Sequence, residues 1–265
     1  MKNYVIPPLK HLEYSELGEA GFYILAHLYL QHPHYREYVR EQKAKGRYLL
    51  LDNSAAENAL VTEDQLIGIC KDVLPDLVVA PDVLFDRDQT EQNLTNFALR
   101  LVDEGLSDKI GLFYCPQGTT RLEWLSSYVY GLSHPQVKVI GLSKIAVPKC
   151  FLDLTGDKGI AEARNECVKT LFDKKLIIKQ IHLLGNGSFG EFEYYKSLPE
   201  EVRQYLKTTD SCYVMLSAAN AIDFTKGDQT RIPTPHDYFD YSFNEDQLML
   251  AHSNGMFFRD LISGI

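Results

Sequence analysis

Short apolar runs of this chain end, again and again, at a carboxylate, an amide or a glycine. The run YLLLD ends at Asp52, LVVAPD ends at Asp82, and KTTD places Asp210 in front of SCYVML. Similar runs stop at Gln117 in LFYCPQG and at Gly141 in VIGLSK. A (β/α)8 barrel gathers its functional groups at the carboxyl ends of buried parallel strands. The pattern predicts such a barrel, with three carboxylates at one end that could move protons and stabilise positive charge.

The apolar runs alternate with helical patterns. Most runs are continuous, which is typical of strands covered on both faces. We expect strands at residues 4–7, 22–27, 48–52, 77–80, 110–114, 137–142, 180–184 and 211–216. Helical spacing predicts helices at residues 34–45, 63–73, 89–104, 122–131, 159–172 and 191–205, with Thr62 as the N-cap of the second. Eight strands, without a glycine-rich phosphate loop after the first, favour a closed α/β barrel over an open nucleotide-binding sheet.

The barrel is expected to span residues 1–225, because 265 residues is close to the ~250 of a single (β/α)8 domain. Residues 226–265 are expected to form a C-terminal loop and helix packed on the barrel, not an independent domain. The loop contains the polar stretch RIPTPHDYFDYSF, and the helix is expected over 244–262 unless Gly255 breaks it.

No run approaches the ~20 consecutive apolar residues of a membrane span, and the N-terminus MKNYVIPPLK lacks an apolar signal core. We therefore expect a cytoplasmic protein without a membrane partner. The five cysteines contain no CxxC pair and the eight histidines no HExxH motif, so neither a metal nor another cofactor is expected. The sequence does not reveal an oligomeric state.

The net charge of −9 argues against tight, sequence-independent binding of nucleic acid by the whole surface. The acidic net charge does not exclude a local basic face that binds nucleic acid. Its candidates are Lys43, Lys45 and Arg47; Lys144, Lys149 and Lys158; and Lys174, Lys175 and Lys179. Taken alone, each cluster is more simply a solvated loop or helix end.

Two of the three carboxylates directly follow apolar strands. Asp52 should be partly desolvated, which raises a carboxyl pKa unless a donor compensates, and which suits a general acid/base or an acceptor for a heterocycle. The alternative is an Asp-Asn-Ser turn that caps the next helix. Asp82 could accept two N–H donors from one planar ligand, or it could be an N-cap, as could Asp86 and Asp88.

The remaining candidates follow later strands. The Gln117 amide offers a donor and an acceptor to a base edge, and Gly118 would let a ligand approach the backbone. Asp210 could act as a nucleophile or stabilise an oxocarbenium-like centre, although a loop aspartate bonded to nearby N–H groups is the alternative. His182, in the strand KQIHLLG, is most simply a core histidine whose ring nitrogens are satisfied.

Taken in order, these strand ends resemble the tRNA-guanine transglycosylase family, including its queuine, archaeosine and DNA-modifying members. The resemblance covers roughly residues 22–221 in six short segments. LLLDNSAAE is similar to the family's TDSGG segment at Asp52, and VVAPD is similar to its purine-recognising segment at Asp82. FYCPQG is similar to the family's QG strand end at Gln117 and Gly118, and VIGLSK is similar to its GGL segment at Gly141 and Leu142. IHLLGNG is similar to HYLMGVG at His182, Leu184, Gly185 and Gly187, and TTDSCYVML is similar to the archaeal FDSASY nucleophile segment at Asp210.

The resemblance implies a barrel enzyme that replaces guanine in a nucleic acid with a 7-deazaguanine such as preQ0 or preQ1. Asp210 would attack the sugar C1′ and expel guanine, and Asp52 would protonate the leaving base. Asp82, Gln117, Gly118 and the backbone of Gly141 and Leu142 would hold the base. The implied partners are DNA or tRNA, whose base would flip out of the stack, and the free 7-deazaguanine base. Lys144, Lys149 and Arg231 are the weak candidates for phosphate contacts.

Departures from the family pattern favour DNA over tRNA. The tRNA enzymes carry a CxCxxC motif and a distant histidine for structural zinc, which this chain lacks, and the glycine pair after the aspartate is replaced by Ala55 and Ala56. Two other functions remain open: a non-catalytic nucleic-acid-binding accessory subunit of a transglycosylase, and a nucleoside-acting glycosidase whose two carboxylates would lie about 5–10 Å apart.

Overall fold

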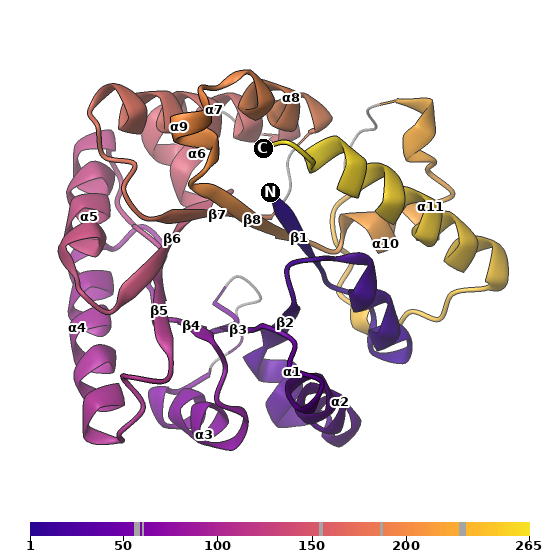
Figure 1. The fold of residues 1–265 in the computed structure, drawn as a ribbon, viewed down its shortest axis with the longest axis horizontal. Coiled ribbons are helices and arrows are strands. Elements are labelled where there is room, and N and C mark those ends of the chain that lie inside the picture. The colour runs from indigo at the N-terminus through magenta and orange to yellow at the C-terminus, as the bar shows by residue number, and fades with distance from the viewer. Residues whose placement is uncertain (56–58, 60, 154–155, 186–187, 228–231) are drawn as a thin grey trace.

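The computed structural model describes residues 1–55, 59, 61–153, 156–185, 188–227 and 232–265. Eight parallel strands form one sheet in the order β1-β8-β7-β6-β5-β4-β3-β2, which curves into a nearly closed barrel ringed by helices (Figure 1). The α/β barrel expected from the sequence is thus confirmed. The strands are β1 (Lys2–Val5), β2 (Phe22–Leu25), β3 (Leu49–Asp52), β4 (Leu77–Val79), β5 (Gly111–Tyr114), β6 (Val137–Ser143), β7 (Gln180–Leu184) and β8 (Leu206–Ser211).

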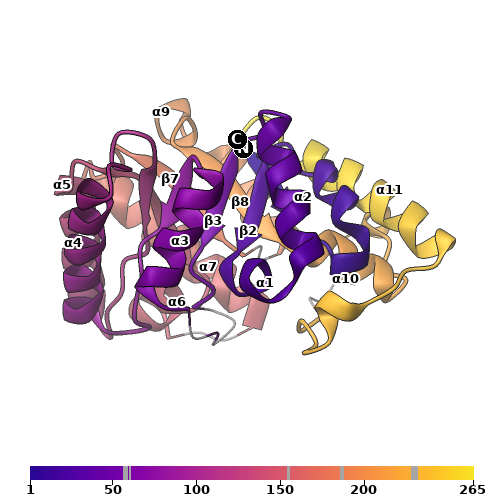
Figure 2. The ribbon, with the colours of Figure 1, turned by 90° about the horizontal axis from the view of Figure 1, so that it is seen from below.

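Helices follow most strands and cover the outside of the barrel (Figures 1 and 2). The α-helices are α1 (Ala26–Gln31), α2 (Pro33–Ala44), α3 (Glu63–Val73), α4 (Arg87–Asp103), α5 (Arg121–Ser133), α6 (Ala146–Phe151), α7 (Gly156–Asp173), α8 (Phe189–Ser197), α9 (Glu200–Arg203), α10 (Tyr213–Ala219) and α11 (Glu245–Ile262). Three 3-10 helices are η1 (Leu9–Leu17), η2 (Phe224–Lys226) and η3 (Tyr238–Asp240).

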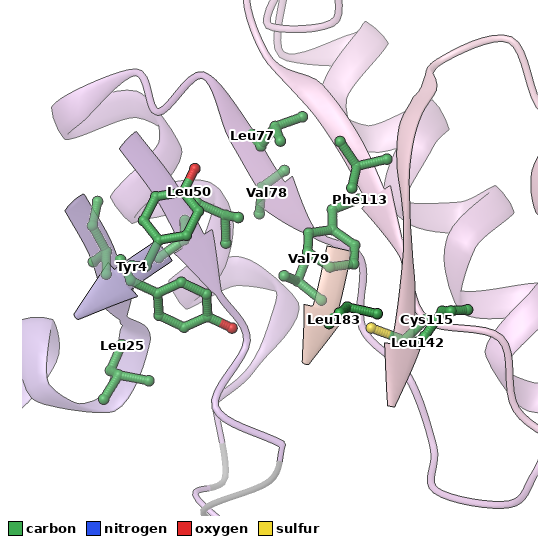
Figure 3. Packing of buried hydrophobic residues seen from close by; sticks show 14 of the residues in the cluster. Tyr4, Leu25, Leu50, Leu77, Val78, Val79, Phe113, Cys115, Leu142 and Leu183 are labelled. Atoms are coloured by element: carbon green, nitrogen blue, oxygen red, sulfur yellow. The ribbon is translucent and has the colours of Figure 1, made fainter. Parts of the chain in front are cut away.

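The strand cores are buried on both faces, as their continuous apolar runs predict. Every residue of β2 and β3 is buried. Figure 3 shows buried side chains from several strands, among them Tyr4, Phe113 and Leu142. Because the strands are parallel, their carboxyl ends meet at one end of the barrel, which we call the carboxyl rim.

The barrel has one seam. In the described sheet, β1 and β2 are its two edges and share no ladder. The segment before β2 lies in the seam: the N–H of Ala20 donates to the carbonyl of Asn3 at 3.1 Å. A Cβ on Gly18 would lie 2.4 Å from that same carbonyl oxygen, so only glycine lets the segment pack this close.

The eighth strand was predicted at the wrong position. Residues 211–216 were expected to form it, but β8 is Leu206–Ser211 and most of the apolar run SCYVML belongs to α10. The run is continuous because α10 is buried nearly all round, which periodicity cannot distinguish from a buried strand. Asp210 therefore lies inside β8, next to its last residue, instead of in front of it.

The structure has helices at the predicted segments, with two corrections. The helix expected over 191–205 is two helices, α8 and α9, separated at Leu198 and Pro199, because the residue before a proline is disfavoured in the α conformation. The terminal helix α11 runs unbroken through Gly255, which is buried against Leu17. Thr62 is the N-cap of α3 as expected, and it forms a capping box with Gln65.

The C-terminal helix lies beside α10 and η1 and reaches β1, so the two chain ends are neighbours (Figures 1 and 2). The N-terminal ammonium group donates to the carbonyls of Ile262 and Ile265. Among the described helices, none is both long and apolar enough to cross a bilayer.

Candidate active site

The three predicted carboxylates share the carboxyl rim. Asp52 ends β3, Asp82 follows β4, and Asp210 is the penultimate residue of β8. The pKa of Cys115, just after β5, depends on the charges of all three carboxylates. Burial raises the pKa of its thiol, and the charges of the three carboxylates raise it further. All three carboxylates therefore lie near enough to Cys115 for their charges to act on its thiol.

Asp210 is buried and carries two hydrogen bonds on one oxygen. Nε2 of His182 lies 2.9 Å from Oδ1, and the N–H of Gly185 donates to the same Oδ1 at 3.0 Å. Within the described residues no hydrogen bond reaches Oδ2. Burial alone would raise the carboxyl pKa, but the bonds from His182 and Gly185, helped by the charge of Lys144, hold it below its ordinary value. These contacts favour the ionised form of the Asp210 carboxyl group.

Gly185 is required for this arrangement. Its φ is +70°, in the left-handed region that glycine adopts without strain. A Cβ here would also lie 2.6 Å from Cδ of Lys144. The glycine therefore lets the backbone N–H face Asp210 while the half-buried Lys144 side chain lies close by.

Asp52 is held on both oxygens. The Tyr23 hydroxyl donates to Oδ1 at 3.0 Å, and the N–H of Ser54 donates to Oδ2 at 2.8 Å. The second bond makes the tight turn that was one alternative for Asp52, but this turn does not cap α3, which begins at Glu63 with Thr62 as its own N-cap. The structure thus supplies the donors that a desolvated Asp52 was expected to need.

Asp82 lies between two amides. Nδ2 of Asn53 donates to Oδ1 at 2.8 Å, and Nε2 of Gln117 donates to Oδ2 at 2.7 Å. We call Asn53, Asp82 and Gln117 the amide–carboxylate cluster. Burial raises the pKa of Asp82 above its ordinary value, although both amides act to lower it. Of the aspartates that could cap α4, Asp86 does so by accepting from the N–H of Gln89.

The predicted glycines also have packing roles. A Cβ on Gly118 would meet the backbone nitrogen of Trp124 at 2.8 Å. A Cβ on Gly141 would lie 2.4 Å from the Phe113 ring, so this glycine makes room for Phe113 inside the barrel. Leu142 is fully buried, and its carbonyl accepts from Arg164 at 3.4 Å. Contact of these backbones with a base stays a prediction.

The three predicted phosphate-binding cations differ in placement. Lys144 lies at the rim, close enough to influence the charge of Asp210. Lys149 is exposed on α6 and forms an ion pair with Asp153 at 3.0 Å. Arg231 lies outside the described residues.

A cavity of about 600 Å³ lies at the opposite end of the barrel, beside the seam. Its lining includes Lys2, Tyr4, Arg47, Tyr48, Gln180 and Thr208, and none of the predicted site residues. We call it the amino-end cavity. It therefore does not hold a ligand of the three carboxylates, although Thr208 connects it with the barrel centre.

Two site residues were not predicted from the sequence. Tyr23 lies in the interior of β2 and reaches Asp52 from the neighbouring strand. Asn53 adjoins Asp52 but points to the next strand end, where it contacts Asp82 and the Ala80 carbonyl. For Asn53, the one signal in the sequence was a polar residue directly after a strand-end aspartate, which is also typical of a turn.

Across the described residues, no group of three His, Cys, Asp or Glu side chains could hold a metal ion. Compared with models of protein families and with curated proteins, the chain matches none.

Proposed function

We propose that this protein is a base-exchange transglycosylase that replaces guanine in a nucleic acid with a 7-deazaguanine. The proposal depends chiefly on Asp210, a carboxylate whose lowered pKa favours its ionised form and whose hydrogen bonds from the described residues both fall on Oδ1. A nucleophile of this kind suits attack on a sugar C1′ that gains positive charge as its base departs. The resemblance of six strand-end segments to the transglycosylases supports the same chemistry.

The first displacement uses two carboxylates. A bond forms between Oδ2 of Asp210 and C1′ while the bond from C1′ to N9 of guanine breaks. The electron pair of that bond stays on guanine, which takes a proton from Asp52. In the second displacement Asp52 removes the N9 proton of the incoming 7-deazaguanine, whose nitrogen attacks C1′ and releases Asp210. The covalent intermediate divides one difficult substitution into two easier ones.

The amide–carboxylate cluster is the proposed base-binding site. An ionised Asp82 accepts two hydrogen bonds in the plane of its carboxylate, which fits the ring N–H and exocyclic amine of a guanine-type base. The adjacent amides of Asn53 and Gln117 fix the carboxylate plane. The bound base must leave its stack to reach the rim, and DNA is the proposed carrier because no zinc motif of the tRNA enzymes is present.

The test is incubation of the protein with labelled preQ0 or preQ1 and either duplex DNA or tRNA, followed by nucleoside analysis. We expect label in DNA, and a covalent adduct that Asp210→Asn abolishes. Asp108→Asn, an exposed carboxylate at the other end of β5, is the matched control and should exchange bases normally.

Other outcomes contradict the proposal in distinct ways. Unchanged exchange by Asp210→Asn would show that Asp210 is not the nucleophile. Binding of nucleic acid without exchange would indicate an accessory subunit, and release of guanine without incorporation would indicate a glycosidase.

A further inference from the structure

His182 has a polar partner at each ring nitrogen although it is completely buried. Nε2 lies 2.9 Å from Oδ1 of Asp210, and Nδ1 lies 2.7 Å from the Thr208 hydroxyl. An ionised carboxylate only accepts hydrogen bonds, so Nε2 must carry the proton. The Thr208 hydroxyl can then donate to a bare Nδ1. The two neighbours on β8 thereby select one tautomer of His182.

Aromatic rings from three other strands fix the orientation of the imidazole. Its ring centroid lies 6.0 Å from that of Tyr4 on β1, 6.3 Å from that of Tyr23 on β2 and 5.2 Å from that of Phe113 on β5. Tyr23 also donates to Asp52. A ring packed on these sides has little freedom to rotate, so its N–H direction is set by the barrel.

The charged surroundings of this pair are few. Lys144 on the loop after β6 and Arg164 on α7 act on Asp210 from the rim side. Burial raises the pKa of Tyr4, which keeps its hydroxyl neutral. Tyr23, whose ring lies near the imidazole, donates to Asp52. Asp210 is therefore the charged group in direct contact with His182.

We propose that His182, as the Nε2–H tautomer selected by Thr208, is the positioning residue that fixes Oδ1 of Asp210 and thereby directs Oδ2 at the sugar carbon. This rests on the proposed function, since it assumes that Asp210 is the nucleophile. Gly185 gives the second fixed donor to Oδ1. Two donors on one oxygen, one from within β7 and one from the residue just after it, fix the carboxylate plane, which a single donor would leave free to turn.

The tautomer is tested without any substrate. In ¹⁵N-histidine-labelled protein, the His182 signals are assigned by their loss in His182→Gln. We expect a proton on Nε2 coupled to that ring nitrogen at neutral pH, and loss of the single-tautomer pattern in Thr208→Val. A proton on Nδ1 alone would overturn the proposal, whether or not the protein exchanges bases.

The positioning role is tested by kinetics. His182→Leu removes the donor, and we expect kcat of base exchange to fall about 10- to 100-fold, as for loss of a hydrogen bond to a charged group. KM for the free base should change little, and the acid limb of kcat should move to higher pH because Asp210 loses a group that favours its ionised form. His182→Gln, which retains an amide N–H, should recover part of the rate and of the pH profile.

An unchanged kcat and acid limb in His182→Leu would refute the role. If His182→Leu fails to fold, Thr208→Val leaves the imidazole in place and should still lower kcat, with Thr208→Ser restoring it. A wild-type protein that exchanges no base would contradict the proposed function instead, and the ¹⁵N measurement would still decide whether His182 donates to Asp210.

Discussion

Among single residues, Asn53 shows how the site controls a carboxylate. Its amide donates both to Asp82 and to the Ala80 carbonyl at 3.0 Å, while its own oxygen accepts from the N–H of Ala55 at 3.0 Å. The side chain is thus fixed at both ends. Asp82 therefore presents its carboxylate in one orientation before any ligand arrives, which reduces the entropic cost of binding.

We predict that Asn53→Ala weakens binding of the free 7-deazaguanine base by about 1–2 kcal/mol, because Asp82 loses a donor that orients and ionises it. Calorimetric titration with preQ0 at neutral pH measures the change in Kd. Asn96→Ala, on the exposed face of α4, is the matched control and should bind as the wild type does. A wild-type Kd in Asn53→Ala would assign the cluster to structure alone.

Because the pKa of Asp82 is raised and that of Asp210 is lowered, we expect affinity for the base and kcat to depend differently on pH. Base recognition needs an ionised Asp82, whose pKa is raised, so affinity is lost as pH falls through that raised value. The displacement needs an ionised Asp210, whose pKa is lowered, so kcat persists to lower pH. On acidification KM for the base should therefore rise before kcat falls. Profiles of both constants test this, and a kcat that falls first would contradict it.

The residues at strand ends were predictable, and their partners were not. Asp52, Asp82 and Gln117 each end an apolar run, which is visible in one segment, whereas Asp210 precedes an apolar run that belongs to α10. Tyr23 is a buried aromatic residue in an apolar strand, and nothing in its own segment distinguishes it from core. Such contacts depend on which strands become neighbours and in what register, so they appear only in the folded barrel.

Among elements, α7 and α8 fix the ends of two strands through one buried ion pair. The guanidinium of Arg164 donates to the carbonyls of Leu142 and Leu184, at the ends of β6 and β7, and to Glu191 at 2.7 Å. Tyr195 donates to the other oxygen of Glu191 at 2.8 Å. The rim beside Asp210 is thereby tied to the outer helices.

Breaking the ion pair between Arg164 and Glu191 should lower the free energy of unfolding. We predict that Arg164→Met or Glu191→Gln each lowers the free energy of unfolding by about 3–5 kcal/mol, because one buried charge is left without its partner. The double variant should lose less than the sum of the two. Urea denaturation of all four proteins gives the coupling energy. Arg87→Ala breaks an exposed pair with Asp88 and should cost at most about 1 kcal/mol. Additive losses would mean that the two groups act independently.

The misplaced eighth strand shows which element could not be predicted. β8 reads LKTTDS, with threonines and a lysine where buried strands usually carry apolar residues, and Thr208 and Asp210 of this strand contact the ring nitrogens of His182. The adjoining α10 is apolar on nearly all sides because it is covered by α11. Polar side-chain contacts thus accompany the polar strand, and burial on nearly all sides makes the helix look like a strand.

For the whole molecule, closure of the barrel depends on the seam between β1 and β2. There the paired ladder is replaced by the segment before β2, and the amino-end cavity lies beside it. The C-terminal helix approaches the same region from outside, where it contacts β1 and η1. We infer that α11 supports β1, one of the two edge strands that have a ladder on one side only.

The importance of α11 for the whole fold can be measured with two substitutions on the same helix. Phe258 is buried, and its ring lies 5.2 Å from that of Phe192 on α8, whereas Met256 is exposed. We predict that Phe258→Ala lowers the free energy of unfolding by about 3–5 kcal/mol, through lost burial and the cavity left behind. Met256→Ala should change it by no more than about 0.5 kcal/mol.

If α11 belongs to the barrel's cooperative unit, urea unfolding of Phe258→Ala should remain a single transition with an unchanged slope. A separate early transition would instead show that residues 226–265 unfold on their own, and that β1 keeps its place without the helix.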